Sequence, residues 1–123
     1  MSGLRALVFG GRRKMKMPTS VIVGPYDIKI GELDPSESEH HYGMFNSQKM
    51  EIRLCKEFSS PVRAADTLLH EVIHSIFHIA NITTANPEDE ERLVTSLSTQ
   101  ICAVVRQNPD LIKYLQESLK GLK

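Results

Sequence analysis

The chain is 123 residues long and 41% hydrophobic, which is enough for one domain with one core and too little for two. No apolar run approaches the ~18 residues of a membrane-spanning helix, so the composition predicts a soluble protein and excludes a transmembrane one. The formal net charge is zero but unevenly spread. Residues 1–18 carry five basic residues and no acid, and the remaining 10 basic and 15 acidic residues give residues 19–123 a net charge of −5.

Residues 1–18 are predicted to be a basic, flexible tail. Their charge follows a short apolar stretch at residues 6–9, whereas a secretory signal has the reverse order. Contact with nucleic acid or a partner through these charges is the alternative. Because residues 19–123 are net acidic and contain no recognition-helix motif, the sequence argues against a nucleic-acid-binding protein. Residues 19–123 are predicted to form a single domain.

The first half of this domain has the patterns of β-strands. Residues 19–31 are rich in β-branched and aromatic side chains and are interrupted at Gly24-Pro25, which predicts a strand with a break. Residues 33–39 are polar and contain a proline, which predicts a loop. Residues 41–45 and 50–54 are predicted to pair as a hairpin, because apolar and charged side chains alternate along the second of them.

Three helices are predicted in the second half. Ser60-Pro61 has the residues of a helix start, and the pattern continues to about residue 80. Asn86-Pro87, followed by four acidic residues, begins a second helix that runs to about Gln107. Asn108-Pro109 begins the third. The predicted fold class is therefore α+β, a small N-terminal antiparallel sheet followed by three helices.

The first predicted helix carries the sequence His70-Glu71-Val72-Ile73-His74. Two histidines four residues apart lie on one face of a helix, so both imidazoles can bind the same metal ion. Glu71, beside the first histidine, is placed to take a proton from a metal-activated water. A single histidine is usually a core or surface residue, but His70, His74 and His78 share one polar stripe opposite the apolar face. This pattern favours metal binding.

A catalytic zinc site usually has three protein ligands and one open position. His78 lies about 12 Å from His70 along the helix axis, so we interpret it as lining the site or lying on the surface. On the second helix, Glu90 falls in the middle of the apolar stripe that runs from residue 93 to residue 105, and Glu91 falls at its edge. Glu90 is therefore predicted as the third ligand, with Glu91 as the alternative; that neither of them binds also stays open.

Residues 67–74 and 90–94 resemble the motifs of small zincin-like metallopeptidases, many of them encoded by bacteriophages. The resemblance covers roughly residues 40–119 and is to the gluzincin arrangement, with two histidines and a downstream glutamate on zinc. It implies a minimal zincin-like fold with one Zn²⁺ on His70, His74 and Glu90, and with Glu71 as general base. It also implies a peptidase acting on a protein or peptide substrate, with residues 50–54 pairing with that substrate. The expected location is the cytoplasm, the host's if the protein is phage-encoded.

Several points remain alternatives at this stage. No downstream Tyr or His motif supplies an oxyanion partner, so His41, Tyr42 and His78 are the candidates. Asp66, one turn before His70, is predicted either to hydrogen-bond a ligand histidine or to be a solvated surface acid. A zinc-binding phage accessory protein without catalytic activity is the alternative function. The sequence predicts neither the substrate nor the oligomeric state.

Overall fold

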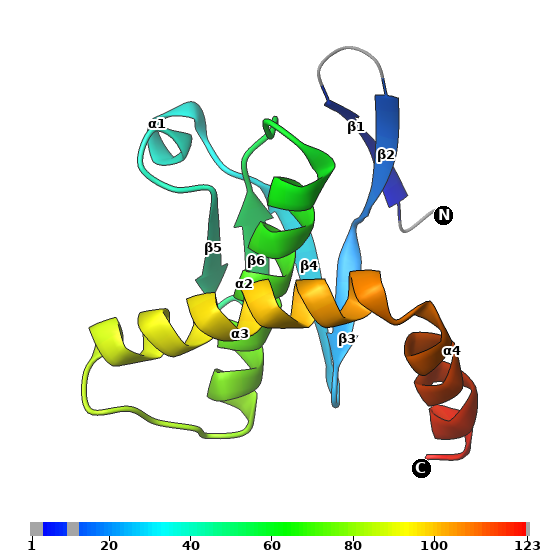
Figure 1. The fold of residues 1–123 in the computed structure, drawn as a ribbon. Helices are drawn as coiled ribbons and strands as arrows, with labels where there is room; N and C mark the ends of the chain where they lie inside the picture. Colours follow the sequence, from blue (N-terminus) through cyan, green and yellow to red (C-terminus); the bar gives the residue numbers. More distant parts are fainter. Residues whose placement is uncertain (1–3, 10–12, 123) are drawn as a thin grey trace.

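A four-stranded sheet, a long helix packed on it and a second long helix packed on the first form the main layers of the computed structural model (Figure 1). The structure describes residues 4–9 and 13–122. Its strands are β1 (Leu4–Phe9), β2 (Arg13–Pro18), β3 (Ser20–Val23), β4 (Tyr26–Glu32), β5 (Gly43–Asn46) and β6 (Glu51–Leu54). Its helices are α1 (Pro35–Ser38), α2 (Pro61–Ile79), α3 (Pro87–Gln107) and α4 (Pro109–Ser118), with a final 3₁₀ turn η1 (Leu119–Gly121). The predicted α+β fold with an N-terminal sheet is confirmed.

The strand order in the four-stranded sheet is β3-β4-β6-β5. The β3–β4 and β5–β6 pairs are antiparallel, but β4 and β6 are parallel, with Ile30 opposite Ile52. The prediction of an antiparallel sheet was therefore wrong in this central pair. Side-chain alternation shows which face of a strand is buried and carries no information on strand direction. Here the segment that holds α1 and β5 carries the chain back, so that β6 runs alongside β4.

Residues 19–31 form two strands of a hairpin where one interrupted strand was predicted. Val23 pairs with Tyr26, which leaves Gly24 and Pro25 as the turn. Gly24 has a φ of +58°, a conformation that glycine adopts without steric cost. The predicted hairpin of β5 and β6 is confirmed, with Phe45 opposite Ile52.

The predicted loop at residues 33–39 contains the short helix α1, which an ion pair fixes to the sheet. The Glu37 carboxylate accepts hydrogen bonds from both terminal nitrogens of Arg53, at 2.8 and 2.6 Å. This guanidinium holds the pKa of Glu37 below its usual value. The following segment is tied to the end of β6, where the Cys55 backbone N–H donates to the Tyr42 carbonyl at 2.9 Å. These contacts hold residues 40–42 beside α2.

The described part of residues 1–18 differs from the predicted flexible tail. β1 and β2 pair antiparallel from Leu4 opposite Pro18 to Phe9 opposite Arg13, as a separate two-stranded sheet. Met17, at the end of β2, is buried in the same core cluster as Ile28. A basic charge does not prevent strand formation, because the pairing depends on backbone hydrogen bonds.

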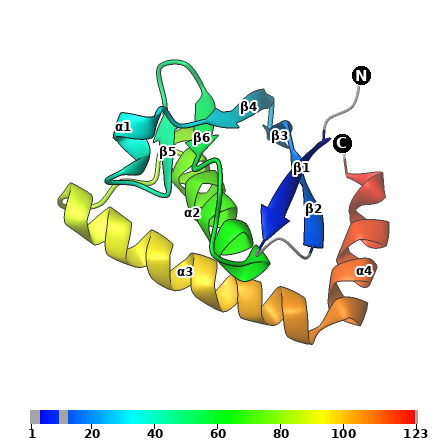
Figure 2. The same ribbon diagram turned by 90° about the horizontal axis from the view of Figure 1, so that it is seen from above.

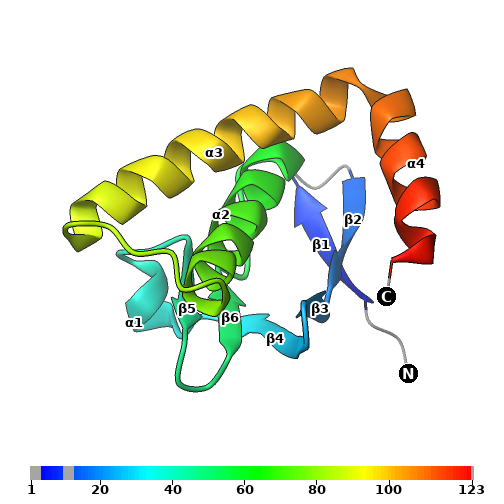
Figure 3. The same cartoon turned by 90° about the horizontal axis from the view of Figure 1, so that it is seen from below.

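Helix α2 is buried on two sides, between the sheet and α3, as Figure 3 shows. Toward the sheet, Leu68 and Val72 pack on a cluster that includes Ile52 and Leu54. Toward α3, Ile73 and Phe77 contact Val94. The predicted helix starts are confirmed: the Ser60 hydroxyl accepts from the Arg63 backbone N–H at 3.1 Å, and the Asn86 side chain accepts from the Asp89 N–H at 2.9 Å. These caps satisfy amide groups that the first turn leaves without helical partners.

Helix α3 buries less of its apolar stripe than the sequence predicts. Val94 and Ser98 are buried, whereas Leu93 and Leu97 are 48% and 42% exposed. α4 turns away from the end of α3 and has no buried residue (Figure 2). Within the described ranges, no helix is long and apolar enough to cross a bilayer.

Candidate metal centre

His70 and His74 point into a cleft between α2, the edge strand β5 and the start of α3. Their Nε2 atoms lie 3.2 Å apart, because residues four apart lie one above the other on a helix. The cleft has a volume of about 900 Å³. Its walls come from β5 and the segment before it, the second half of α2, residues 81–86 and the first turns of α3. Both histidines therefore face the same cleft.

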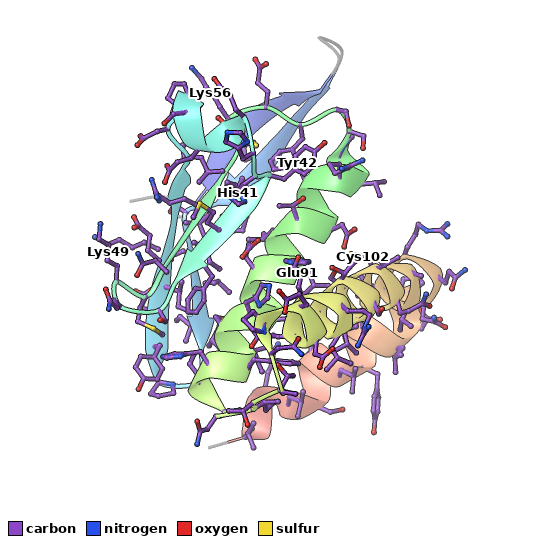
Figure 4. All side chains as sticks on the ribbon, turned by 90° about the vertical axis from the view of Figure 1, so that its left-hand side faces the viewer. His41, Tyr42, Lys49, Lys56, Glu91 and Cys102 are labelled. Carbon is purple, nitrogen blue, oxygen red and sulfur yellow. The ribbon has the colours of Figure 1, made fainter. Side chains whose placement is uncertain are left out.

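Glu91 supplies the third donor group. One of its carboxylate oxygens lies 3.0 Å from Nε2 of His70, and the other lies 2.9 Å from Nε2 of His74. Figure 4 shows Glu91 where α3 passes α2. The ligand atoms of His70, His74 and Glu91 all lie within 4.8 Å of one another, so the three residues could hold a metal ion.

Glu90, the predicted third ligand, has a different position. Its carboxylate accepts a hydrogen bond from Nδ1 of His74 at 2.7 Å, on the side of the ring away from His70. The geometry thus corrects the prediction, with Glu91 in the group of donors and Glu90 behind His74. The physical reason is the rotation of α3 about its axis. The helix packs against α2 through Val94 and Ser98, and Glu91 lies on that same face. The centre of the apolar stripe, where Glu90 lies, is rotated away from it.

Glu71 is a buried carboxylate at the wall of the cleft. Glu71 is 6% exposed, and no group in the described part of the chain donates a hydrogen bond to its carboxylate. Burial raises the pKa of Glu71 from its ordinary value of 4.5 to about 7, against the opposing effect of His74. A carboxyl group with a pKa near neutrality can both accept and release a proton at physiological pH.

Gly43, at the start of β5, allows the strand to lie against Glu71. A Cβ atom at this position would be 2.9 Å from Leu54 Cδ2 and from Thr67 Cγ2, and 3.1 Å from Glu71 Cγ. Any side chain here would push the strand and the helix apart. Gly43 was not among the site residues predicted from the sequence, although a glycine inside a predicted strand is a known sign of close approach by a neighbouring segment.

The electrostatics of His70 suit a metal ligand. Burial lowers the pKa of His70 below its usual value of 6.5, and the nearby Glu91 carboxylate opposes this change. A lowered pKa favours the neutral imidazole, which is the form that binds metal ions. At His74, Nδ1 faces Glu90, so Nε2 is the nitrogen that faces His70 and Glu91 and is available to a metal ion.

The pKa of Glu71 predicts how the stability of the metal-free protein depends on pH. Between pH 4.5 and about 7, folded Glu71 keeps a proton that the unfolded chain has lost, so the free energy of unfolding falls as pH rises. The total loss is about 3 kcal/mol. Glutamine cannot ionise, so in a chelating buffer Glu71→Gln should match the wild type near pH 4.5 and be more stable above pH 7. Urea unfolding of both proteins across this range measures the difference, and a constant difference would contradict the assignment.

The remaining candidates lie around the cleft in different roles. His78 is exposed and lines the cleft, with its ring 6.1 Å from that of Phe45. His41 also lines the cleft. The Tyr42 ring stacks on Phe58 at 6.4 Å between ring centres, and the Arg63 guanidinium lies over it at 4.8 Å from its centre. Figure 4 shows His41 and Tyr42 on the segment beside α2.

Comparison with known proteins gives no match to a family model, to a curated protein or to a solved structure. The chemistry of the site itself is therefore the basis for a functional assignment.

Proposed function

We propose that this chain is a zinc-dependent peptidase in which His70, His74 and Glu91 bind one Zn²⁺ and Glu71 is the general base. The observation that carries the proposal is the convergence of the three donor groups. Two nitrogen ligands at 2.0–2.1 Å in tetrahedral geometry are about 3.3 Å apart. The two Nε2 atoms are 3.2 Å apart, and the Glu91 oxygens lie 2.9–3.0 Å from them. The side chains therefore have the spacing of ligands to a single ion.

The hydrogen bonding around His74 is also compatible with a cation at this point. The Glu90 carboxylate accepts a hydrogen bond from Nδ1 of His74, so in the neutral ring the proton lies on Nδ1 and Nε2 presents a lone pair. That lone pair faces a Glu91 oxygen at 2.9 Å, and a carboxylate oxygen is an acceptor only. Two acceptors at this distance repel one another unless a proton or a metal ion lies between them. Two imidazoles and one carboxylate form the ligand set of catalytic zinc sites that keep a fourth position for water.

The proposed mechanism divides the work between the ion and Glu71. When bound, zinc supplies a water molecule whose pKa is lowered to about 7 and polarises the substrate carbonyl. The Glu71 carboxylate takes a proton as water attacks the carbonyl carbon and returns it to the nitrogen of the departing amine. Its burial prevents bulk water from solvating the charge, and its place beside His70 keeps it at the reacting atoms. His41 and His78 line the same cleft and are the candidates for stabilising the oxyanion.

An extended peptide can bind along β5 under this proposal. β6, residues 51–54, was expected to pair with the substrate, but it lies between β4 and β5 and has no free edge. β5 is the edge strand, and Gly43, Met44 and Phe45 line the cleft that holds the metal ligands. An edge strand offers backbone donors and acceptors to an added strand.

The test is a zinc-dependent cleavage assay. The zinc-loaded protein is incubated with a mixture of proteome-derived peptides, and new termini are identified by mass spectrometry. The proposal expects cleavage that stops when a zinc chelator is added and resumes when zinc is restored. Cleavage that persists at full rate in the chelator would assign the activity to a contaminant and contradict the proposal.

A second candidate is a structural zinc site without catalysis. The ligands come from two helices, and α3 buries few of its own residues, so an ion here would fix α3 to α2. Chelation should then unfold or loosen the α2–α3 pair, while Glu71→Gln leaves every measurable function unchanged. A zinc-loaded protein that cleaves no peptide in the assay favours this candidate over the peptidase.

A further inference from the structure

A second cavity adjoins the metal centre. Its volume is about 430 Å³, and it is enclosed by residues 40–43, the first half of α2 and one face of α3. It shares His70, Glu71 and Glu91 with the larger cleft, so the two spaces meet at the metal ligands. A substrate bound across the metal centre would therefore extend into both.

Asp66 lines this second cavity and has an unusual environment. One oxygen of its carboxylate is fully buried and has no hydrogen-bond partner, the only such side-chain atom found in the described part of the chain. Arg63 also lines this cavity, but its guanidinium lies over the Tyr42 ring, and no ion pair among the described residues joins it to Asp66. Asp66 as a residue is only partly buried, and none of the described residues donates a hydrogen bond to its carboxylate or forms an ion pair with it. A carboxylate without a counter-charge therefore lines this cavity, and a cationic group of a ligand is the partner that it lacks.

The position of Asp66 sets the kind of cation that fits. Asp66 lies one turn before His70 on the same helix, and the midpoint of His70 and His74 is about 9 Å further along the axis at 1.5 Å per residue. If the carbonyl of the cleaved bond lies at the metal, the α-ammonium group of the same residue is too close to the metal to reach Asp66. A lysine side chain has a four-carbon stem that places its ammonium about 6 Å from its own Cα. A long basic side chain next to the cleaved bond therefore covers most of this distance, and the Asp66 side chain, which lines the cavity, covers the remainder.

We propose that the second cavity is a specificity subsite, in which Asp66 binds the lysine or arginine side chain of a substrate residue adjacent to the cleaved bond. The proposal rests on the peptidase function proposed above and adds the class of substrate. The carboxylate gains the partner that the free protein lacks, and a neutral or acidic side chain in the same place leaves it unpaired. The proposal therefore predicts a preference for peptides with a basic residue next to the cleaved bond.

The test measures binding without cleavage. Zinc-loaded Glu71→Gln protein is titrated with three blocked peptides that differ at one position: lysine, its uncharged analogue norleucine, and glutamate. We expect the lysine peptide to bind about 10- to 100-fold more tightly than the norleucine peptide. Adding Asp66→Asn should abolish this preference, and the matched change Asp110→Asn, on the exposed helix α4, should leave it intact.

The outcomes separate this proposal from the function on which it rests. Equal affinity for the three peptides, or a preference that survives Asp66→Asn, would overturn the subsite, even if zinc-dependent cleavage is observed. A lysine preference that depends on Asp66 in protein that binds no zinc would support the subsite and contradict the peptidase. If Asp66→Asn does not fold, as judged by its thermal unfolding, the three peptides with the Glu71→Gln protein alone decide the question.

Discussion

Glu71→Gln is expected to leave one zinc ion per chain and to lower peptide hydrolysis about 10²- to 10⁴-fold, the usual contribution of a general base. Glutamine has the size of glutamate and cannot accept the proton from the attacking water. Glu71 does not belong to the proposed ligand group of His70, His74 and Glu91, so the change should leave metal binding unaffected. The measurement is kcat/KM for a cleaved peptide, together with the zinc content of the same preparation.

The control for this change is Glu88→Gln. Glu88 is an exposed acid in the first turn of α3, and it does not line the cleft. It should keep full activity. The loss in Glu71→Gln cannot come from unfolding, because glutamine removes a buried ionisable group and should not destabilise the metal-free protein. A Glu71→Gln protein with wild-type kcat/KM would exclude Glu71 as the base.

Glu91→Gln is expected to weaken zinc binding by more than about 100-fold, and Glu90→Gln by about 10- to 100-fold, the range for groups that orient a ligand. The first change removes the charge of a proposed ligand whose oxygens lie 2.9 and 3.0 Å from the two Nε2 atoms. The second weakens the bond that holds the ring of His74 in its orientation. Dissociation constants come from competition with a chromophoric zinc chelator.

The order of these two effects tests the correction made by the structure. A larger loss in Glu90→Gln than in Glu91→Gln would restore Glu90 as the ligand, as the sequence analysis predicted. Equal and small losses would mean that neither carboxylate binds the ion and that His70 and His74 are the only protein ligands. Glu88→Gln serves again as the matched control in the same helical turn.

The parts of the site that the sequence predicted are those encoded locally. The spacing of His70, Glu71 and His74 determines their common face once the helix forms, and Ser60-Pro61 marks where that helix begins. Neither feature depends on how distant segments pack. For the same reason the start of α3 and its acidic first turn were predicted correctly.

The parts that were missed depend on packing between elements. The choice between Glu90 and Glu91 depends on how α3 is rotated about its axis. The apolar stripe of α3 is wider than the face that the helix buries, so the centre of the stripe does not mark the side that faces the two histidines. The parallel pairing of β4 with β6 depends on the path of the intervening segment. The close contact at Gly43 and the burial of the Asp66 oxygen arise only when the elements pack together, so no local sequence pattern predicts them.

The central claim is that His70, His74 and Glu91 form a zinc site, and the most direct test is the metal content of the purified protein. Elemental mass spectrometry is applied to the wild type, His70→Ala and His74→Ala after zinc loading and removal of free ions. The expected result is one zinc per wild-type chain and none in either variant. A wild type that retains no zinc, or a His70→Ala variant that retains a full equivalent, would contradict the claim.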